Sequence, residues 1–331
     1  MKKRDPGIPD EPDKGVERMT TLAREGKKIR KYSLMERRNF PWVYGFLLPT
    51  LLLFAVFYVE PIIQTFVTSF AKFNGYTSPE WSFDLQNLGG TIFRNYTKLF
   101  SMSSFGPALR NLFWWSLIAM TAHVGVGVAV GMLLYHKLRG WKFVRIVYMV
   151  PNVISGAAWA MIYRFMFNDD IGVINNVIRS VSPDSHIQWF YSSPAAFWAI
   201  TFTWVFYAVI VALVVMGDLM AIPASLHEAC EIDGANGFQK LIHIDLPLCR
   251  NAIGTSVLLS VTSRIAMYEN IALTSRGGPG NDTYGLALIL TKSITDFNYG
   301  LANATAMLMF VFGIVTMQII NKVFRMNDSV Y

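Results

Sequence analysis

Charged residues are scarce in this 331-residue sequence: Asp, Glu, Lys and Arg make up 15% of it, and hydrophobic residues make up 53%. A soluble domain is usually about 25% charged, so this composition excludes an ordinary soluble protein. Cysteine is scarce too, because only Cys230 and Cys249 occur. Two cysteines cannot build a disulfide framework, and they fit a reducing compartment. These shortages together indicate a membrane protein.

The sequence also lacks the residue sets that covalent chemistry requires. No Gly-Lys-Ser/Thr phosphate loop follows a strand, and no Gly-x-Ser-x-Gly elbow occurs. His227 has no second histidine at the offset of a zinc motif, and Asp169-Asp170 has no third ligand nearby. We therefore expect no enzyme, and neither a cofactor nor a metal in this chain.

The charge that is present gathers at the start of the chain. Twelve of the 29 Lys and Arg residues lie in residues 1–40, and the net charge is +7. A basic segment before a membrane span favours the cytoplasmic side and anionic lipid. No aromatic residues alternate with these charges as they would in a nucleic-acid site, so no nucleic-acid partner is expected. Met19–Tyr32 is a candidate amphipathic helix.

Apolar runs of roughly the 20 residues that a bilayer requires follow this tail. They predict an all-α membrane protein with six spans, both termini inside, and cytoplasmic loops at 137–145 and 218–247. Pro49 and Pro61 are expected to bend or break the first span, and 71–109 is expected outside. The predicted spans are 39–70, 111–136, 144–167, 194–216, 249–274 and 301–321.

Two features of the predicted second span are best explained by packing. Gly127 and Gly131, with Gly125, offer a small-residue face on which another helix can pack closely. His123 lies within the same span. A lone membrane histidine can relay protons, but a hydrogen-bonded packing role is the favoured interpretation.

The loop at 218–247 predicts two short helices rather than an irregular connection. Pro223 suits the first turn of a helix, and Gly234 suits the left-handed residue that closes it. Asn236 can cap a second helix, which Pro247 is expected to end. Small residues and the carboxylates of Glu228 and Asp233 would give this loop a compact docking surface.

The predicted fifth span carries two charges, Arg264 and Glu269. Charges within a span are costly and usually face a bundle interior or a water-filled cavity. Five residues of helix turn them about 140° apart, so we expect no simple pair on one face. A permeation pathway and an ion pair with a partner subunit remain equally open. The pathway interpretation adds Tyr268 and Asn270, with Trp204 of the fourth span as a weaker candidate.

Two motifs resemble one family. The first comprises Glu228, Ala229, Asp233, Gly234, Ala235, Ile244, Leu246 and Pro247, and it is similar to the cytoplasmic coupling motif of permease subunits of ATP-binding-cassette importers. Cys230 stands where that family usually has a second alanine. The second motif resembles an external signature of carbohydrate-uptake permeases, the first of two unlike permeases: Gly277, Gly278, Pro279, Gly280 and Thr283.

The resemblance implies the partners and the site of energy use. A separate ATPase dimer would bind ATP and magnesium and receive residues 228–247, a second permease would complete the pathway, and an extracytoplasmic binding protein would deliver a sugar. It places the chain in a bacterial inner membrane, with a tail at 1–40, a permease domain at 41–325 and a short end at 326–331. A secondary transporter or channel that uses Arg264 and Glu269 is the alternative, and a membrane enzyme is a third class.

Overall fold

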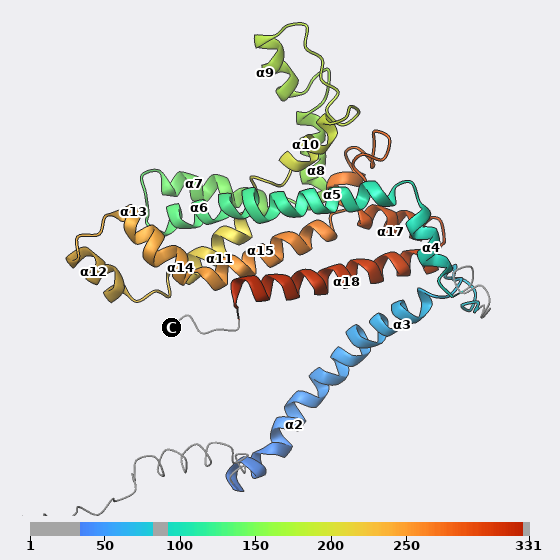
Figure 1. The fold of residues 1–331 in the computed structure, drawn as a ribbon, viewed down its shortest axis with the longest axis horizontal. Helices are drawn as coiled ribbons and strands as arrows, with labels where there is room; N and C mark the ends of the chain where they lie inside the picture. Colours follow the sequence, from blue (N-terminus) through green and yellow to red (C-terminus); the bar gives the residue numbers. More distant parts are fainter. Residues whose placement is uncertain (1–33, 82–91, 327–331) are drawn as a thin grey trace, which may run out of the picture. The chain divides into compact units, whose positions relative to one another are not determined.

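The computed structural model describes residues 34–81 and 92–326, which are largely helical (Figure 1). Sheet structure within these ranges is limited to one isolated bridge between Lys72 and Glu80. The chain divides into two compact units, Met1–Ile62 and Ile63–Tyr331. The predicted all-helical character is confirmed for the described ranges, whereas the candidate helix at Met19–Tyr32 lies outside them.

The first unit contains α2 (Leu34–Phe54), the π-helical turn η1 (Ala55–Val59) and the start of α3 (Glu60–Thr68). Tyr44–Thr68 is a single apolar helix of 25 residues, long enough to cross a bilayer. Pro49 and Pro61 were expected to bend or break the span, and the helix is not broken at either residue. The π-helical turn η1 ends two residues before Pro61, and its wider backbone gives the proline ring room beside the preceding carbonyls.

The second unit begins its long helices with α4 (Arg94–Ser101) and α5 (Phe105–Ile118). α5 continues through the π-helical turn η2 (Ala119–His123) into α6 (Val124–Tyr135), which gives one helix of 31 residues. The predicted external segment at 71–109 therefore contains α4 and the start of α5. Asn95 fixes α4 to the preceding chain, because its Nδ2 donates to the carbonyls of Ser69 and Ala71, both at 2.8 Å.

The predicted third span is not one continuous helix. α7 (Trp141–Met149) and the 3-10 turn η3 (Val150–Val153) meet α8 (Gly156–Met166) at 110°. Pro151 has no N–H to continue α7. Ser155 then starts a new helix, because its backbone is extended and its Oγ accepts from the Ala158 N–H at 3.2 Å.

The predicted fourth span is also interrupted. After α9 (Val173–Val181), the chain forms α10 (Ala195–Phe202) and α11 (Val209–Leu219), with a non-helical segment between them. Side chains from other helices satisfy the backbone of this segment. Trp159 Nε1 donates to the Thr203 carbonyl at 2.6 Å, and the Ala208 N–H donates to the Tyr148 hydroxyl at 2.9 Å. Such partners make a broken helix tolerable within a membrane.

The segment after α11 leads through short helices into the next long one. These are α12 (Ala224–Ile232), α13 (Gly237–Lys240), the π-helical turn η4 (Leu241–Asp245), α14 (Leu246–Leu248), α15 (Arg250–Ile265) and α16 (Glu269–Ala272). The prediction that Pro247 ends the second loop helix is wrong, because Pro247 lies inside α14. The π-helical turn η4 before it widens the backbone, so the ring of Pro247 avoids a clash with a preceding carbonyl.

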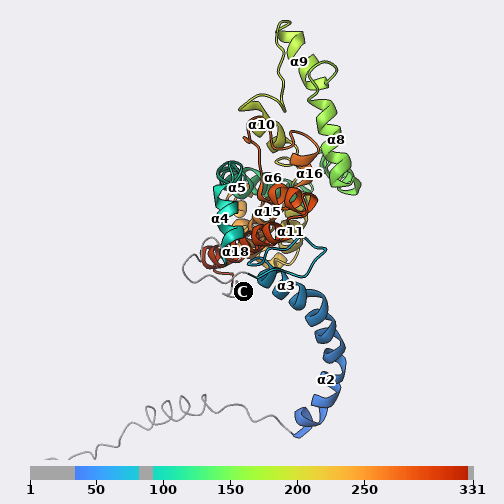
Figure 2. The same ribbon diagram turned by 90° about the vertical axis from the view of Figure 1, so that its right-hand side faces the viewer.

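The helix that precedes the last span was not predicted. α17 (Leu286–Thr295) is apolar but has 10 residues, and it precedes α18 (Tyr299–Phe324) of 26 residues. Figure 1 and Figure 2 show α5, α6, α11, α15 and α18 alongside one another. By length and composition, the described residues hold three helices able to cross a membrane, or five if each sharply bent pair counts as one span. Six spans therefore stay a prediction.

Small residues allow a close contact between α6 and α11. A Cβ added at Gly127 would lie 2.5 Å from the Val211 side chain, and one at Gly131 would lie 2.8 Å from the Ala212 carbonyl oxygen. A Cβ at Gly125 would meet nothing within 4 Å. Gly127 and Gly131 therefore form the predicted close-approach face, whereas Gly125 does not contribute to it.

Candidate functional site

The loop between α11 and α15 is an ordered helix–turn–helix, which we call the knob (residues 224–248). Gly234 has φ +75° and closes α12 as predicted. The Ala235 N–H donates to the Cys230 carbonyl at 2.9 Å, and the Gly234 N–H donates to Glu231 O at 3.1 Å. This pair of bonds is the Schellman motif. Pro223 occupies the N-cap of α12, one position earlier than predicted.

Asn236 begins the second helix of the knob with a reciprocal cap. Its Oδ1 accepts from the Gln239 N–H at 2.9 Å, while Gln239 Oε1 accepts from the Asn236 N–H at 2.8 Å. Both ends of the turn therefore satisfy their own backbone groups. Bonds within the knob therefore hold the turn between its two helices.

The exposed surface of the knob combines carboxylates, small residues and apolar side chains. Ile232 is 87% exposed and Phe238 is 69% exposed. Such a surface on an ordered loop is typical of a docking site. Of the predicted coupling residues, Cys230, Ala235, Ile244 and Leu246 are half-buried, and the others are exposed: Glu228, Ala229, Asp233, Gly234 and Pro247. Ile244 and Leu246 pack on the core below.

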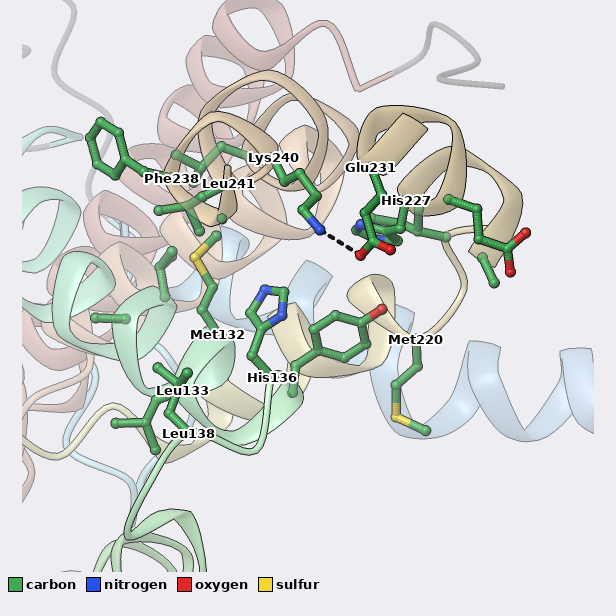
Figure 3. Close-up of a pocket in the computed structure, with 18 of the residues that line it drawn as sticks. Met132, Leu133, His136, Leu138, Met220, His227, Glu231, Phe238, Lys240 and Leu241 are labelled. Atoms are coloured by element: carbon green, nitrogen blue, oxygen red, sulfur yellow. Dashed lines mark hydrogen bonds and ion pairs between the residues drawn. The ribbon is translucent and has the colours of Figure 1, made fainter. Parts of the chain in front are cut away.

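Lys240 joins the two helices of the knob. Its Nζ lies 2.7 Å from Glu231 Oε1, and this contact is the dashed line of Figure 3. The hydrogen bond from Lys240, reinforced by its charge, lowers the pKa of Glu231 from its ordinary value. Because Glu231 is exposed, solvent and salt screen this pair. It orients the two helices but contributes little to stability.

A buried carboxylate connects the knob to the membrane helices. Asp245 in η4 is fully buried, and its Oδ2 lies 3.1 Å from Nε2 of His136, at the end of α6. Its Oδ1 lies 3.6 Å from Nε2 of His227 in α12. A carboxylate only accepts, so the His136 Nε2 donates. We call these three residues the histidine–aspartate bracket. Sequence reasoning missed it, although an aspartate flanked by Ile244 and Leu246 was a signal.

The bracket borders a large cavity of about 1290 Å³ between the end of α6 and the knob. Figure 3 shows His136 directed into this space from α6, with Lys240 and Glu231 on the opposite side. Apolar side chains such as Met132 and Leu241 line the rest. The knob and α6 are thus separated by the cavity over much of their facing surfaces, and the contact of His136 with Asp245 joins them beside it.

The predicted pathway residues do not form one cluster. The Arg264 guanidinium lies over the Trp204 ring, 4.0 Å from its centroid. Asn270 Nδ2 donates to Thr203 Oγ1 at 2.7 Å. Glu269 instead meets the start of α8, because a Cβ built on Gly156 would lie 1.9 Å from Glu269 Oε2.

Tyr268 is 36% exposed. Within the described ranges, no ion pair joins Arg264 to Glu269. The structure therefore brings Trp204 together with Arg264, whereas Asn270 bonds Thr203 and Glu269 lies against Gly156.

The glycine-rich loop at 277–283 is a tight turn held against α5. Gly277 and Gly280 have φ of +91° and +53°. Thr283 is buried and its hydroxyl donates to the Gly278 carbonyl at 2.6 Å. Asp282 Oδ1 lies 3.2 Å from Arg110 Nη2. A hydrogen bond from Ser193, followed by that from Arg110, lowers the pKa of the Asp282 carboxyl.

His123 has the structural role that was favoured for it. It is buried, and its Nδ1 lies 3.1 Å from the carbonyl oxygens of both Trp204 and Val205, which lie in the break between α10 and α11. Long apolar helices and backbone breaks supported by side chains are typical of a multi-pass membrane protein.

Comparison with known proteins identifies its family. Residues 123–325 match the family described as "Binding-protein-dependent transport system inner membrane component". This chain belongs to that family, whose members are permease subunits of ATP-binding-cassette importers and not enzymes.

Individual relatives agree over most of the chain. It is similar to the diacetylchitobiose uptake system permease protein NgcF of Streptomyces coelicolor, with 31% identity over 86% of this chain and 81% of NgcF. The trehalose/maltose permease MalF of Thermococcus litoralis is 26% identical over 81% of this chain and 88% of MalF. A chain from a bacterial alginate ABC transporter, solved with an alginate pentasaccharide-bound periplasmic protein, shares the fold with TM-score 0.68. Its identity is 18%, and the match covers 87% of this chain and 95% of that one.

Proposed function

We propose that this chain forms the membrane pathway for a sugar or oligosaccharide and couples it to a separate ATPase through the knob. In this proposal a second permease completes the pathway, and an extracytoplasmic binding protein delivers the substrate. ATP and magnesium bind to the ATPase dimer, and the complex lies in a bacterial inner membrane.

The exposed knob is the observation that carries the proposal. Its caps are internally satisfied, yet Ile232 and Phe238 are exposed on an ordered turn. Apolar side chains that the chain itself leaves uncovered fit a cleft of another subunit. The small residues Ala229 and Gly234 would let that cleft approach the backbone closely.

The histidine–aspartate bracket suggests how movement of the knob reaches the membrane. Asp245 lies on the helical path from α13 into α15, and His136 ends α6. A displacement of the knob is therefore transmitted to two long helices at once. Alternation between two arrangements of these helices, biased by ATP at a distant site, is an allosteric coupling of the kind that importers require.

The carbohydrate assignment follows the relatives rather than the geometry. The permeases NgcF and MalF are named for diacetylchitobiose and for trehalose and maltose. The glycine-rich loop at 277–283 also resembles the carbohydrate-uptake signature. We therefore infer a sugar substrate for this chain.

We further propose six spans with both termini in the cytoplasm. Residues 1–40 form a basic tail, 41–325 the permease domain and 326–331 a short end. α15 with α16 would supply a span although α15 has 16 residues. The knob would lie inside, on the same side as the basic loop at 137–145.

Co-purification of the ATPase with matched knob variants tests the assignment. Glu228→Lys and Gly234→Pro should lose the ATPase and uptake, because one reverses a docking charge and the other cannot adopt φ +75°. Ser225→Lys and Gly237→Pro are the controls. Ser225 is exposed in the same helix, and Gly237 occupies the first helical position, where proline is tolerated. Retention of the ATPase by both test variants would remove the coupling role.

A further inference from the structure

The cavity beside Arg264 has the chemistry of an anion site. It measures about 230 Å³, several times the roughly 30 Å³ that one water molecule occupies in the liquid. It lies among α11, α15 and the break before α11, and none of the residues that line it is acidic. Its cation is Arg264, and its aromatic surface comes from Trp204 and Tyr207.

Arg264 lacks an anionic partner among the described residues. Its Nε and Nη2 both contact the hydroxyl of the adjacent Ser263, at 3.3 and 3.0 Å. Its Nη1 contacts only Met267 Sδ, at 3.7 Å. Glu269, the carboxylate nearest in sequence within this span, is held against Gly156 instead. A guanidinium has five N–H donors, and here they meet one hydroxyl and one thioether.

Two residues that line this cavity carry polar atoms without partners. Trp204 Nε1 and Ser260 Oγ are both buried and make no hydrogen bond within the structure. Buried polar groups are otherwise nearly always paired, so unsatisfied ones call for an explanation. An oxygen-rich ligand that accepts from the guanidinium, the indole and the hydroxyl would explain all three.

We propose that this cavity binds an acidic substituent of the transported sugar, a carboxylate, sulfonate or phosphate. The inference rests on the proposed function, since it names the chemistry of its substrate. A neutral sugar would displace water from Arg264 without supplying a counter-charge, which is costly in a membrane interior. Planar bidentate pairing with oxyanions is the interaction for which arginine is suited. The rings of Trp204 and Tyr207 would contact the apolar face of the sugar.

Fluorescence titration of the purified transporter complex in detergent tests the site with simple probes in place of the transported sugar. The probes are sodium glucuronate, sodium sulfate and neutral glucose, at constant ionic strength. Because Trp204 lies under Arg264, the two anions should change tryptophan emission saturably and glucose should not. Arg264→Gln should weaken the anion response at least about tenfold, since it removes a charge-assisted contact. Trp204→Phe should lose the signal.

Arg164→Gln is the matched control. Arg164 is a half-buried arginine of α8 whose Nη1 donates to the Leu273 carbonyl, and it does not line this cavity. The site is disproved if neither anion changes the wild-type emission, or if Arg264→Gln responds as wild type does. Retention of the ATPase in these samples separates this failure from failure of the importer assignment.

The rival partner for Arg264 is a carboxylate of the second permease. In that case Arg264→Gln would release the second permease during purification while Arg264→Lys retained it. Our proposal predicts that both variants keep the second permease. Its selective loss from Arg264→Gln would assign the guanidinium to the subunit interface and overturn the anion site.

Discussion

Replacement of His136 by alanine tests whether the histidine–aspartate bracket connects the knob to α6. The change leaves the fully buried Asp245 with only the 3.6 Å contact to His227. Hydrogen bonds to charged groups contribute about 1.5–3 kcal/mol, and a buried acceptor without a donor costs a similar amount. The His136 side chain is itself 37% exposed, so water can replace part of the contact. We expect the free energy of unfolding to fall by about 1–2 kcal/mol.

A double-mutant cycle isolates this contact from other effects of the substitution. With Asp245→Asn already present, His136→Ala should cost about 1 kcal/mol less than it does alone, because no buried charge is left behind. Unfolding in mixed detergent micelles, followed by circular dichroism, measures the four proteins. Lys240→Ala, which removes the screened pair with Glu231, should leave the midpoint nearly unchanged. Strictly additive effects of His136→Ala and Asp245→Asn would refute the bracket.

Two further predictions address packing and topology. Gly131→Leu should destabilise the protein by about 1–3 kcal/mol through overlap with the Ala212 carbonyl, whereas Gly125→Leu should be tolerated. Unfolding midpoints measure both effects, and equal effects would contradict the α6–α11 contact. In intact cells, cysteines introduced at Ser78 and Asn281 should react with an impermeant thiol reagent, and one at Ser33 should not; external labelling at Ser33 would invert the proposed topology.

Local backbone chemistry made the knob predictable from the sequence. Gly234 at a left-handed position and Asn236 as a cap depend on neighbours within a few residues. The same holds for the close-approach face of Gly127 and Gly131, because helical spacing alone places them together. The caps depend on local sequence, whereas the glycines that actually meet α11 are set by the tertiary structure, as Gly125 shows.

The interruptions of the third and fourth spans could not be predicted in the same way. Both segments are apolar enough to be interpreted as continuous helices. The break before α11 is stable because Trp159, Tyr148 and His123 satisfy its backbone from other elements. Such partners are distant in sequence, so hydropathy alone cannot reveal them. α17 was missed because 10 residues are too few for a spanning pattern.

The candidate sites likewise divide into residues that local sequence identifies and residues that only the fold brings together. The motif residues of the knob were named from their spacing, whereas Asp245 and its histidines are joined only by the fold. Arg264 was singled out as a charge within a span, yet its stacking on Trp204 depends on the break between α10 and α11. The sequence therefore located the charges, and the fold determined their partners.

The energy source of uptake tests the central claim most directly. The complex containing this chain, the ATPase and the second permease would be reconstituted in proteoliposomes with the binding protein outside and its bound sugar radiolabelled. The account predicts uptake that requires internal ATP and magnesium, and that persists when proton and sodium gradients are dissipated. Uptake that is driven by an ion gradient in the absence of ATP would contradict it and support a secondary transporter.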